Sequence, residues 1–277
     1  MTDVVLTILV GIIILGGLQS IAKAAEKIVP AMAVVYIVAV ISLLIINREQ
    51  LPMAIELVFV NAFTPTAAMG GFLGASVMKG IQSGIARGIF SNESGLGSAP
   101  IVAAAAKTKW PAEQGLISMT GTFIDTIIIC TMTGLAVISS GLWTTELNGA
   151  VLTNGAFSQA FPLFGDYLIT IALVLFAFTT ILGWSYYGER CAVYLFGTKV
   201  IKPYRLVFIA IIATAAFLKL EEIWALADIV NGLMAFPNLV ALLLLSGTVV
   251  SESKRYMNYL KERSRRLSSY KNINNKI

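Results

Sequence analysis

Long apolar stretches, separated by short polar segments, dominate the hydrophobic pattern of the chain. A helix that crosses a bilayer needs about 20 mostly apolar residues in a row, and several stretches reach that length. We predict seven transmembrane helices, at residues 4–22, 28–46, 67–90, 113–140, 165–196, 203–219 and 224–250. The apolar segment 52–64 is too short to cross, so we expect a helix lying at the membrane interface. The pattern therefore predicts an all-α, polytopic membrane protein.

The composition supports this fold class. Mean hydropathy is +0.82, and charged residues make up 13% of the chain, about half the share of roughly 25% in soluble domains. The first apolar stretch has no basic segment before it, so we expect a retained helix and not a cleaved signal peptide. We expect a transmembrane domain at residues 1–253, followed by a basic cytoplasmic tail at 254–277.

Lysine and arginine gather on one side of the predicted membrane. Seventeen of the twenty fall on that side, eight of them in the tail. Because cytoplasmic segments are enriched in these residues, we expect a multi-pass plasma-membrane protein with its N-terminus outside and its C-terminus in the cytoplasm. The net charge of +5 then reflects orientation and not nucleic-acid binding. We expect the tail to be loosely ordered and to face lipid headgroups; the alternative is a specific partner site.

The residues needed for most catalytic sites are missing from the sequence. It contains no histidine, which is the commonest general base and a common metal ligand. It also shows no paired-carboxylate motif and no nucleophile with a base. We therefore predict that the protein is not an enzyme and uses no cofactor. Its two cysteines, Cys130 and Cys191, are too few for a disulfide framework, and we expect both to be packing residues.

Two ionisable residues, Lys79 and Asp125, lie within predicted helices. An unpaired charge in hydrocarbon costs at least about 2.5–3.5 kcal/mol, so each should face the protein interior or water. Asp125 either accepts hydrogen bonds that hold helices together or takes part in ion or substrate passage. Lys79 either snorkels or pairs, or has a functional role.

The third predicted helix is unusually rich in glycine. Such a helix either packs closely against another through small residues or contains an unwound segment that presents backbone groups to a substrate or cation. The glycines are Gly70, Gly71, Gly74, Gly80, Gly84 and Gly88.

Two adjacent hydroxyls lie midway along the fifth predicted helix, at Thr179 and Thr180. Such hydroxyls often bond to carbonyls of their own helix. Alternatively, together with the carbonyl of Phe176, they provide hard and neutral oxygen ligands that suit a small cation such as Na⁺. Trp184 lies about one turn further along the same helix.

Four motifs of this chain resemble the alanine or glycine:cation symporter family, the sodium:alanine symporters. They are GGFLGASVM at 70–78, ARGIFSNESGLGSAP at 86–100, GTFIDT at 121–126 and GWSYYGE at 183–189. The resemblance implies a LeuT-like fold of the APC superfamily, built from two inverted five-helix repeats. It also implies secondary active uptake of alanine or glycine coupled to Na⁺, with H⁺ as the alternative ion.

The resemblance assigns roles to three sets of residues. The substrate-binding set is Gly71, Phe72, Gly74, Ser76 and Trp184. The cation-binding set is Phe176, Thr179 and Thr180, with Na⁺ at the two threonines. The candidate gate or relay residues are Arg87, Asn92, Glu93 and Asp125. For Arg87, Asn92 and Glu93, simple helix-end capping is the alternative.

The resemblance further implies an incomplete fold that begins at the fourth core helix. In the family, the first core helix supplies about half of the ligands to substrate and sodium. We therefore expect a separate polypeptide that carries the missing N-terminal helices, beside alanine or glycine, Na⁺ and membrane lipids as partners. The alternative is a non-transporting truncated remnant or a membrane interaction subunit.

Overall fold

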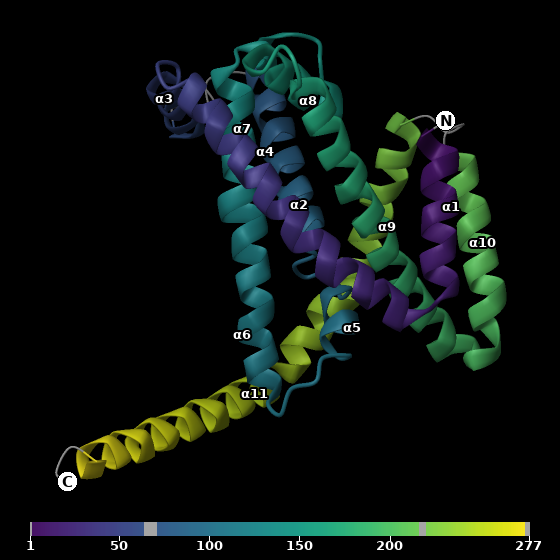
Figure 1. Cartoon of the computed structure of the whole chain (residues 1–277), viewed down its shortest axis with the longest axis vertical. Helices are drawn as coiled ribbons and strands as arrows, with labels where there is room; N and C mark the ends of the chain where they lie inside the picture. Colours follow the sequence, from purple (N-terminus) through teal and green to yellow (C-terminus); the bar gives the residue numbers. More distant parts are fainter. Residues whose placement is uncertain (1, 64–70, 216–219, 275–277) are drawn as a thin grey trace. The chain divides into compact units, whose positions relative to one another are not determined.

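The computed structural model describes the chain apart from residues 1, 64–70, 216–219 and 275–277, and every regular element in the described ranges is a helix (Figure 1). This confirms the all-α fold class. The chain divides into two compact units. The first unit consists of residues 1–85 and 126–223, and the second of residues 86–125 and 224–277.

The helices follow one another with short connections. They are α1 (Thr2–Leu15), α2 (Leu18–Ile46), α3 (Leu51–Phe63), α4 (Gly71–Asn92), α5 (Ala99–Ala103), α6 (Pro111–Thr122), the π-helix η2 (Phe123–Cys130), α7 (Thr131–Ser139), the 3₁₀ turn η3 (Leu142–Thr144), α8 (Gly149–Ala160), α9 (Gly165–Phe196), the 3₁₀ turn η4 (Thr198–Val200), α10 (Ile201–Thr214) and α11 (Leu220–Asn274).

Helix α9 is the centre of the first unit, where it packs against α1, α2, α8 and α10 (Figure 1). Two clusters of buried side chains hold it there. One cluster joins α9 to α2, α7 and α8 through Tyr36, Ala39, Val40, Leu43, Ala136, Phe157, Ile169 and Ala172. The other joins α9 to α1 through Val10, Ile14, Phe178 and Leu182. These positions recur three or four residues apart, which gives each helix a buried stripe.

Helices occur in all seven predicted spans, but most of their bounds differ from the prediction. Among the described residues, four helical stretches are long and apolar enough to cross a membrane: Leu18–Ile46, Pro111–Ser139, Gly165–Phe196 and Glu222–Arg266. The predicted span 165–196 agrees with α9. Helices α1 and α10 have 14 residues each, which is shorter than the predicted spans 4–22 and 203–219.

The boundary between the first two predicted spans was wrong for a local reason. Gly16 and Gly17 end α1, and Gly17 has a φ of 78°, a left-handed conformation that glycine adopts without steric cost. The apolar residues that follow therefore start α2, which continues through Lys23 and Lys27 to Ile46. The segment expected at the interface is helix α3, with 13 residues.

Helical segments that were not anticipated include the short α5, helix α8 and the end of α11. Helix α8 lies in a stretch for which we predicted no helix, and it buries Phe157 against α9. Helix α11 continues without interruption to Asn274, so the expectation that residues 254–274 are loosely ordered was wrong. That tail has many residues with good helix propensity, such as lysine, arginine, glutamate and leucine.

Candidate functional site

The buried stripe of α9 changes from apolar to polar along the helix. Phe178 and Leu182 pack on α1, and Ser185 and Glu189 continue the same buried face about one and two turns later. The spacing of three or four residues keeps all four on one side of the helix. The apolar part thus holds α9 in place, and it positions a carboxylate at the end of the stripe.

Thr179 lies beside this stripe and is half-buried. Its hydroxyl lies 3.0 Å from the carbonyl oxygens of both Leu175 and Phe176, and 4.0 Å from Met32 Sδ on α2. The hydroxyl therefore donates to its own helix, as one of the two sequence interpretations expected. A donating hydroxyl keeps two lone pairs, so Thr179 and the two carbonyls form a group of three neighbouring oxygens.

The other residues proposed on α9 face elsewhere. Thr180 is exposed, because one residue turns the helix by about 100°. Phe176 is half-buried, and its ring packs edge-to-face on Tyr36 at 5.3 Å. Trp184 is half-buried and packs edge-to-face on Tyr187 with ring centroids 5.6 Å apart. The structure thus brings Thr179 and the Phe176 carbonyl together, but not Thr180.

The proposed substrate residues on α4 are described only in their backbone. Residues 71–76 are α-helical, while Gly70 and the side chains of 71–77 and Lys79 lie outside the described part of the structure. At Gly80, Gly84 and Gly88, a Cβ atom would have no described neighbour within 4 Å. The described part of the chain therefore does not use these three glycines for close helix packing.

The candidate gate residues lie in the second unit. Arg87 Nη2 donates to Asp228 Oδ2 at 2.8 Å, and the Arg87 guanidinium lies 4.1 Å from the ring centroid of Trp224. Both partners come from α11, and the sequence interpretation had named neither. Each charged side chain is about 40–46% exposed, so this ion pair is accessible to solvent and is not a buried salt bridge.

Asp125 accepts a hydrogen bond of 2.7 Å from the Ser91 hydroxyl near the end of α4. This fits the interpretation in which Asp125 holds helices together. Asn92 accepts a hydrogen bond from the backbone N–H of Ser94 at 2.9 Å, and Glu93 has a φ of 56°. Asn92 and Glu93 thus shape the turn that ends α4, as expected of helix-end residues.

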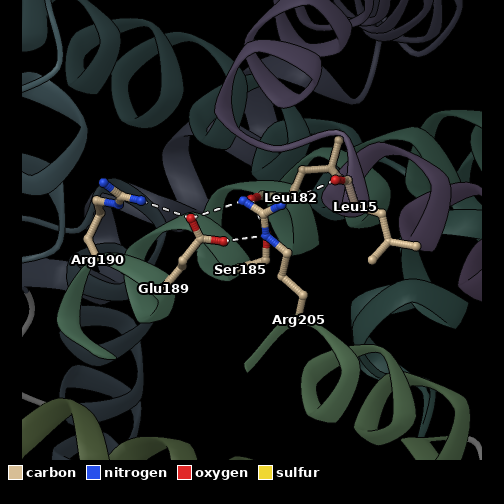
Figure 2. A network of polar contacts seen from close by, with 6 residues as sticks. All are labelled: Leu15, Leu182, Ser185, Glu189, Arg190 and Arg205. Carbon is tan, nitrogen blue, oxygen red and sulfur yellow. Dashed lines mark hydrogen bonds and ion pairs between the residues drawn. The ribbon is translucent and has the colours of Figure 1, made fainter. Parts of the chain in front are cut away.

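A charged network that the sequence interpretation missed lies at the end of the α9 stripe (Figure 2). Glu189 Oε2 accepts from Arg205 Nε at 2.6 Å, and Glu189 Oε1 accepts from Arg205 Nη2 at 3.2 Å and from Arg190 Nη2 at 2.9 Å. The side chains of Glu189 and Arg205 are only 6% and 16% exposed, whereas that of Arg190 is 39% exposed. The two-bond geometry and the burial make Arg205 the principal partner.

Arg205 also reaches the turn between α1 and α2. Its Nη1 donates to the carbonyl oxygen of Leu15 at 3.2 Å (Figure 2), one of the last four carbonyls of α1, which lack helical partners. A Cβ atom on Gly17 would lie 3.2 Å from Arg205 Nη2, so the guanidinium sits closely against this turn. The network therefore joins α9, α10 and the end of α1.

One sequence signal could have revealed part of this network. Glu189 lies 11 residues after Phe178, so the apolar stripe predicts that it is buried and needs a cationic partner. Sequence spacing does not choose between Arg190 and Arg205. Arg205 was counted only among the cytoplasmic charges that set the orientation.

The described residues hold no group of three or more Cys, Asp or Glu side chains that could bind a metal ion. Neither Cys130 nor Cys191 forms a disulfide, and both are exposed and not packed in the interior as expected.

Comparison with known proteins agrees with the motifs. The model of the sodium:alanine symporter family matches residues 1–270. An uncharacterized transporter of Haemophilus influenzae is 56% identical over 262 residues, which cover 94% of this chain and 58% of the relative. The sodium/alanine symporter AgcS of Methanococcus maripaludis is 49% identical over 259 residues, covering 92% and 56%.

A probable sodium/glutamine symporter of Bacillus subtilis, GlnT, is 40% identical over 248 residues, covering 89% of this chain and 51% of the relative. The chain thus spans about half the length of the curated relatives it matches.

Proposed function

Because this chain belongs to the sodium:alanine symporter family, we propose that it forms part of a secondary transporter that couples uptake of alanine or glycine to entry of Na⁺. The observation that carries this proposal is the match over residues 1–270, together with the oxygen group at Thr179 in the central helix of the first unit. The proposal includes a LeuT-like arrangement of helices, with the N-terminus outside and the C-terminus in the cytoplasm.

In this proposal, Na⁺ binds beside α9. The Thr179 hydroxyl donates a hydrogen bond to a carbonyl of its own helix and directs a lone pair at the ion. The Phe176 carbonyl supplies a second oxygen, since it lies 3.0 Å from that hydroxyl. Neutral oxygens suit a monovalent cation, because a divalent ion is normally held by carboxylates. Thr180 joins the site only if a further ligand approaches its exposed side.

The substrate pocket of the proposal includes Trp184 and the α4 residues Gly71, Phe72, Gly74 and Ser76. A half-buried tryptophan limits the side chain that fits, and so favours alanine or glycine over larger amino acids. The name of the Bacillus subtilis relative includes glutamine, so the substrate needs a direct test. Arg87 and Asp228 are the proposed polar gate, since their exposed ion pair can open at little cost.

The test is uptake of labelled alanine into vesicles under an inward Na⁺ gradient. The chain is reconstituted alone, and also with the segment of the methanococcal symporter that it does not match. We expect Na⁺-dependent uptake of alanine when the added segment is present. Glycine should inhibit this uptake more strongly than glutamine does. No uptake in either preparation, with the protein shown to be inserted, would contradict a transport function.

Substitutions on α9 then test the cation site. Thr179→Ala should raise the Na⁺ concentration for half-maximal uptake about tenfold, which corresponds to about 1.4 kcal/mol of lost binding free energy. Thr180→Ala shows whether the second hydroxyl contributes. Thr153→Ala is the matched control, because its exposed hydroxyl also bonds to its own helix, on α8. Unchanged Na⁺ dependence in Thr179→Ala would refute the site.

A further inference from the structure

An apolar groove lies within the second unit, between α5, α6 and α11. Its volume is about 990 Å³, and most of its lining area comes from apolar atoms. The walls include Ala103, Pro111, Leu116, Met119, Val249 and Met257. Leu116, Met119, Val249 and Met257 are each about half exposed. An apolar surface that is open in this way needs an apolar occupant wherever it would otherwise meet water.

Two membrane helices place this groove at the edge of the hydrocarbon layer. The candidate span Pro111–Ser139 begins at the groove. The apolar part of α11 ends beside it at Val250, after which the sequence continues as SESKRYMNYLKERSRR. The beginning of one span and the end of the other therefore meet at the same level, and the groove crosses the boundary between hydrocarbon and headgroups.

The polar end of the groove is aromatic and basic. Trp110 packs against both Tyr256 and Tyr259, with ring centroids 5.8 and 5.1 Å away, and tryptophan and tyrosine favour the headgroup level of a bilayer. Lys109 lines the groove. Arg255 lies 5.5 Å from the centroid of the Trp110 ring.

Positive charge exceeds negative charge at this end. Lys107 and Lys254 are exposed and adjoin lining residues in the sequence. Their positive charges add to that of Lys109, which lines the groove itself. The acidic side chain in the lining, Glu252, lies 3.6 Å from Arg255 and is offset by it. The site thus combines an apolar cleft with a cationic rim, which complements a molecule with an acyl chain and an anionic head.

We propose that this groove binds one anionic phospholipid. An acyl chain lies along the apolar walls formed by α6 and α11, and the phosphate contacts Lys109 with the neighbouring Lys107 and Lys254. Basic pockets at the cytoplasmic ends of membrane helices bind anionic headgroups in this way. A zwitterionic lipid fits the cleft equally well, but it gains less from the rim. Lipid binding here does not depend on transport.

The experiment uses quenching of Trp110 fluorescence by brominated acyl chains. The full chain, with its other three tryptophans replaced by phenylalanine, is placed in phosphatidylcholine vesicles that contain increasing brominated phosphatidylglycerol. A matched series uses brominated phosphatidylcholine. We expect phosphatidylglycerol to reach half-maximal quenching at a mole fraction about three- to tenfold lower. Equal quenching by the two lipids would overturn the proposal.

Two paired variants separate the headgroup contact from general charge. Lys107→Gln with Lys109→Gln should abolish the preference for phosphatidylglycerol. Lys199→Gln with Lys202→Gln removes the same charge from the first unit and should leave the preference intact. If the first pair keeps the preference, the rim does not bind the headgroup.

A substitution in the cleft tests the apolar contact. Ala103→Phe should weaken quenching by both lipids, because the larger side chain fills part of the cleft. Retained quenching would refute binding in the cleft. If neither lipid quenches and a cysteine placed at Ala103, in a chain whose Cys130 and Cys191 are replaced by serine, forms a disulfide between two chains, a second copy covers the groove and the proposal fails.

Discussion

Removing the carboxylate of Glu189 should destabilise the first unit far more than removing its neighbour Arg190. Glu189→Gln keeps the size of the side chain but leaves the guanidinium of Arg205, which is 16% exposed, without its anion. Breaking a buried ion pair from one side typically costs about 3–5 kcal/mol. The remaining bond to the Leu15 carbonyl keeps the loss within that range. Arg190→Met removes an ion pair whose arginine is 39% exposed, and should cost about 1 kcal/mol or less.

The measurement is reversible unfolding in mixed micelles, with helicity followed by circular dichroism while the fraction of denaturing detergent rises. The double variant Glu189→Gln with Arg205→Met removes both buried charges. Its loss of unfolding free energy should therefore be smaller, by about 0.5–3 kcal/mol, than the sum of the losses measured for Glu189→Gln alone and for Arg205→Met alone. Equal losses for the Glu189 and Arg190 variants, or strict additivity in the double variant, would refute the claim that Arg205 is the principal partner.

Two further substitutions test packing in the first unit. Tyr36→Phe removes the hydrogen bond of 2.7 Å with Thr133 and should lower the free energy of unfolding by about 0.5–1.5 kcal/mol in the same assay; no change would mean that the bond is not formed in the membrane. Gly188→Ala would push a methyl group into the Tyr204 hydroxyl and should cost about 1–3 kcal/mol. Tyr204→Phe should restore part of that loss, whereas Gly183→Ala, which faces open space, should cost nothing.

Much of the helical architecture could be predicted because apolar length is a local property. The span 165–196 agrees with α9 because every position between Gly165 and Phe196 belongs to one uninterrupted pattern. The boundary between α1 and α2 was predicted wrongly because two glycines, Gly16 and Gly17, interrupt an otherwise apolar run. Helix α8 has a modest apolar content, and its helix depends on contact with α9, which no local pattern reveals.

The site could be predicted only in part. The residue types and order around Thr179 indicated an oxygen group on the fifth predicted helix, and the structure shows that the hydroxyl and the Phe176 carbonyl are neighbours. That Thr180 turns away follows from helix geometry and could have been expected. Asp228 is 141 residues from its partner Arg87, so this pairing depends on tertiary structure alone.

The π-helical segment at Phe123–Cys130 changes the directions in which the following side chains point, relative to a continuous α-helix. A π-turn accommodates one more residue than an α-turn, and one residue corresponds to about 100° of rotation. If the same residues formed a regular α-helix, Thr133 and Ala136 would turn by about 100°, away from the side on which α7 meets α2, whereas deleting one residue there would remove the extra residue and leave their direction unchanged. A deletion of one residue should therefore be tolerated better in this segment than in a regular α-helix, where it would rotate all the residues that follow by about 100°.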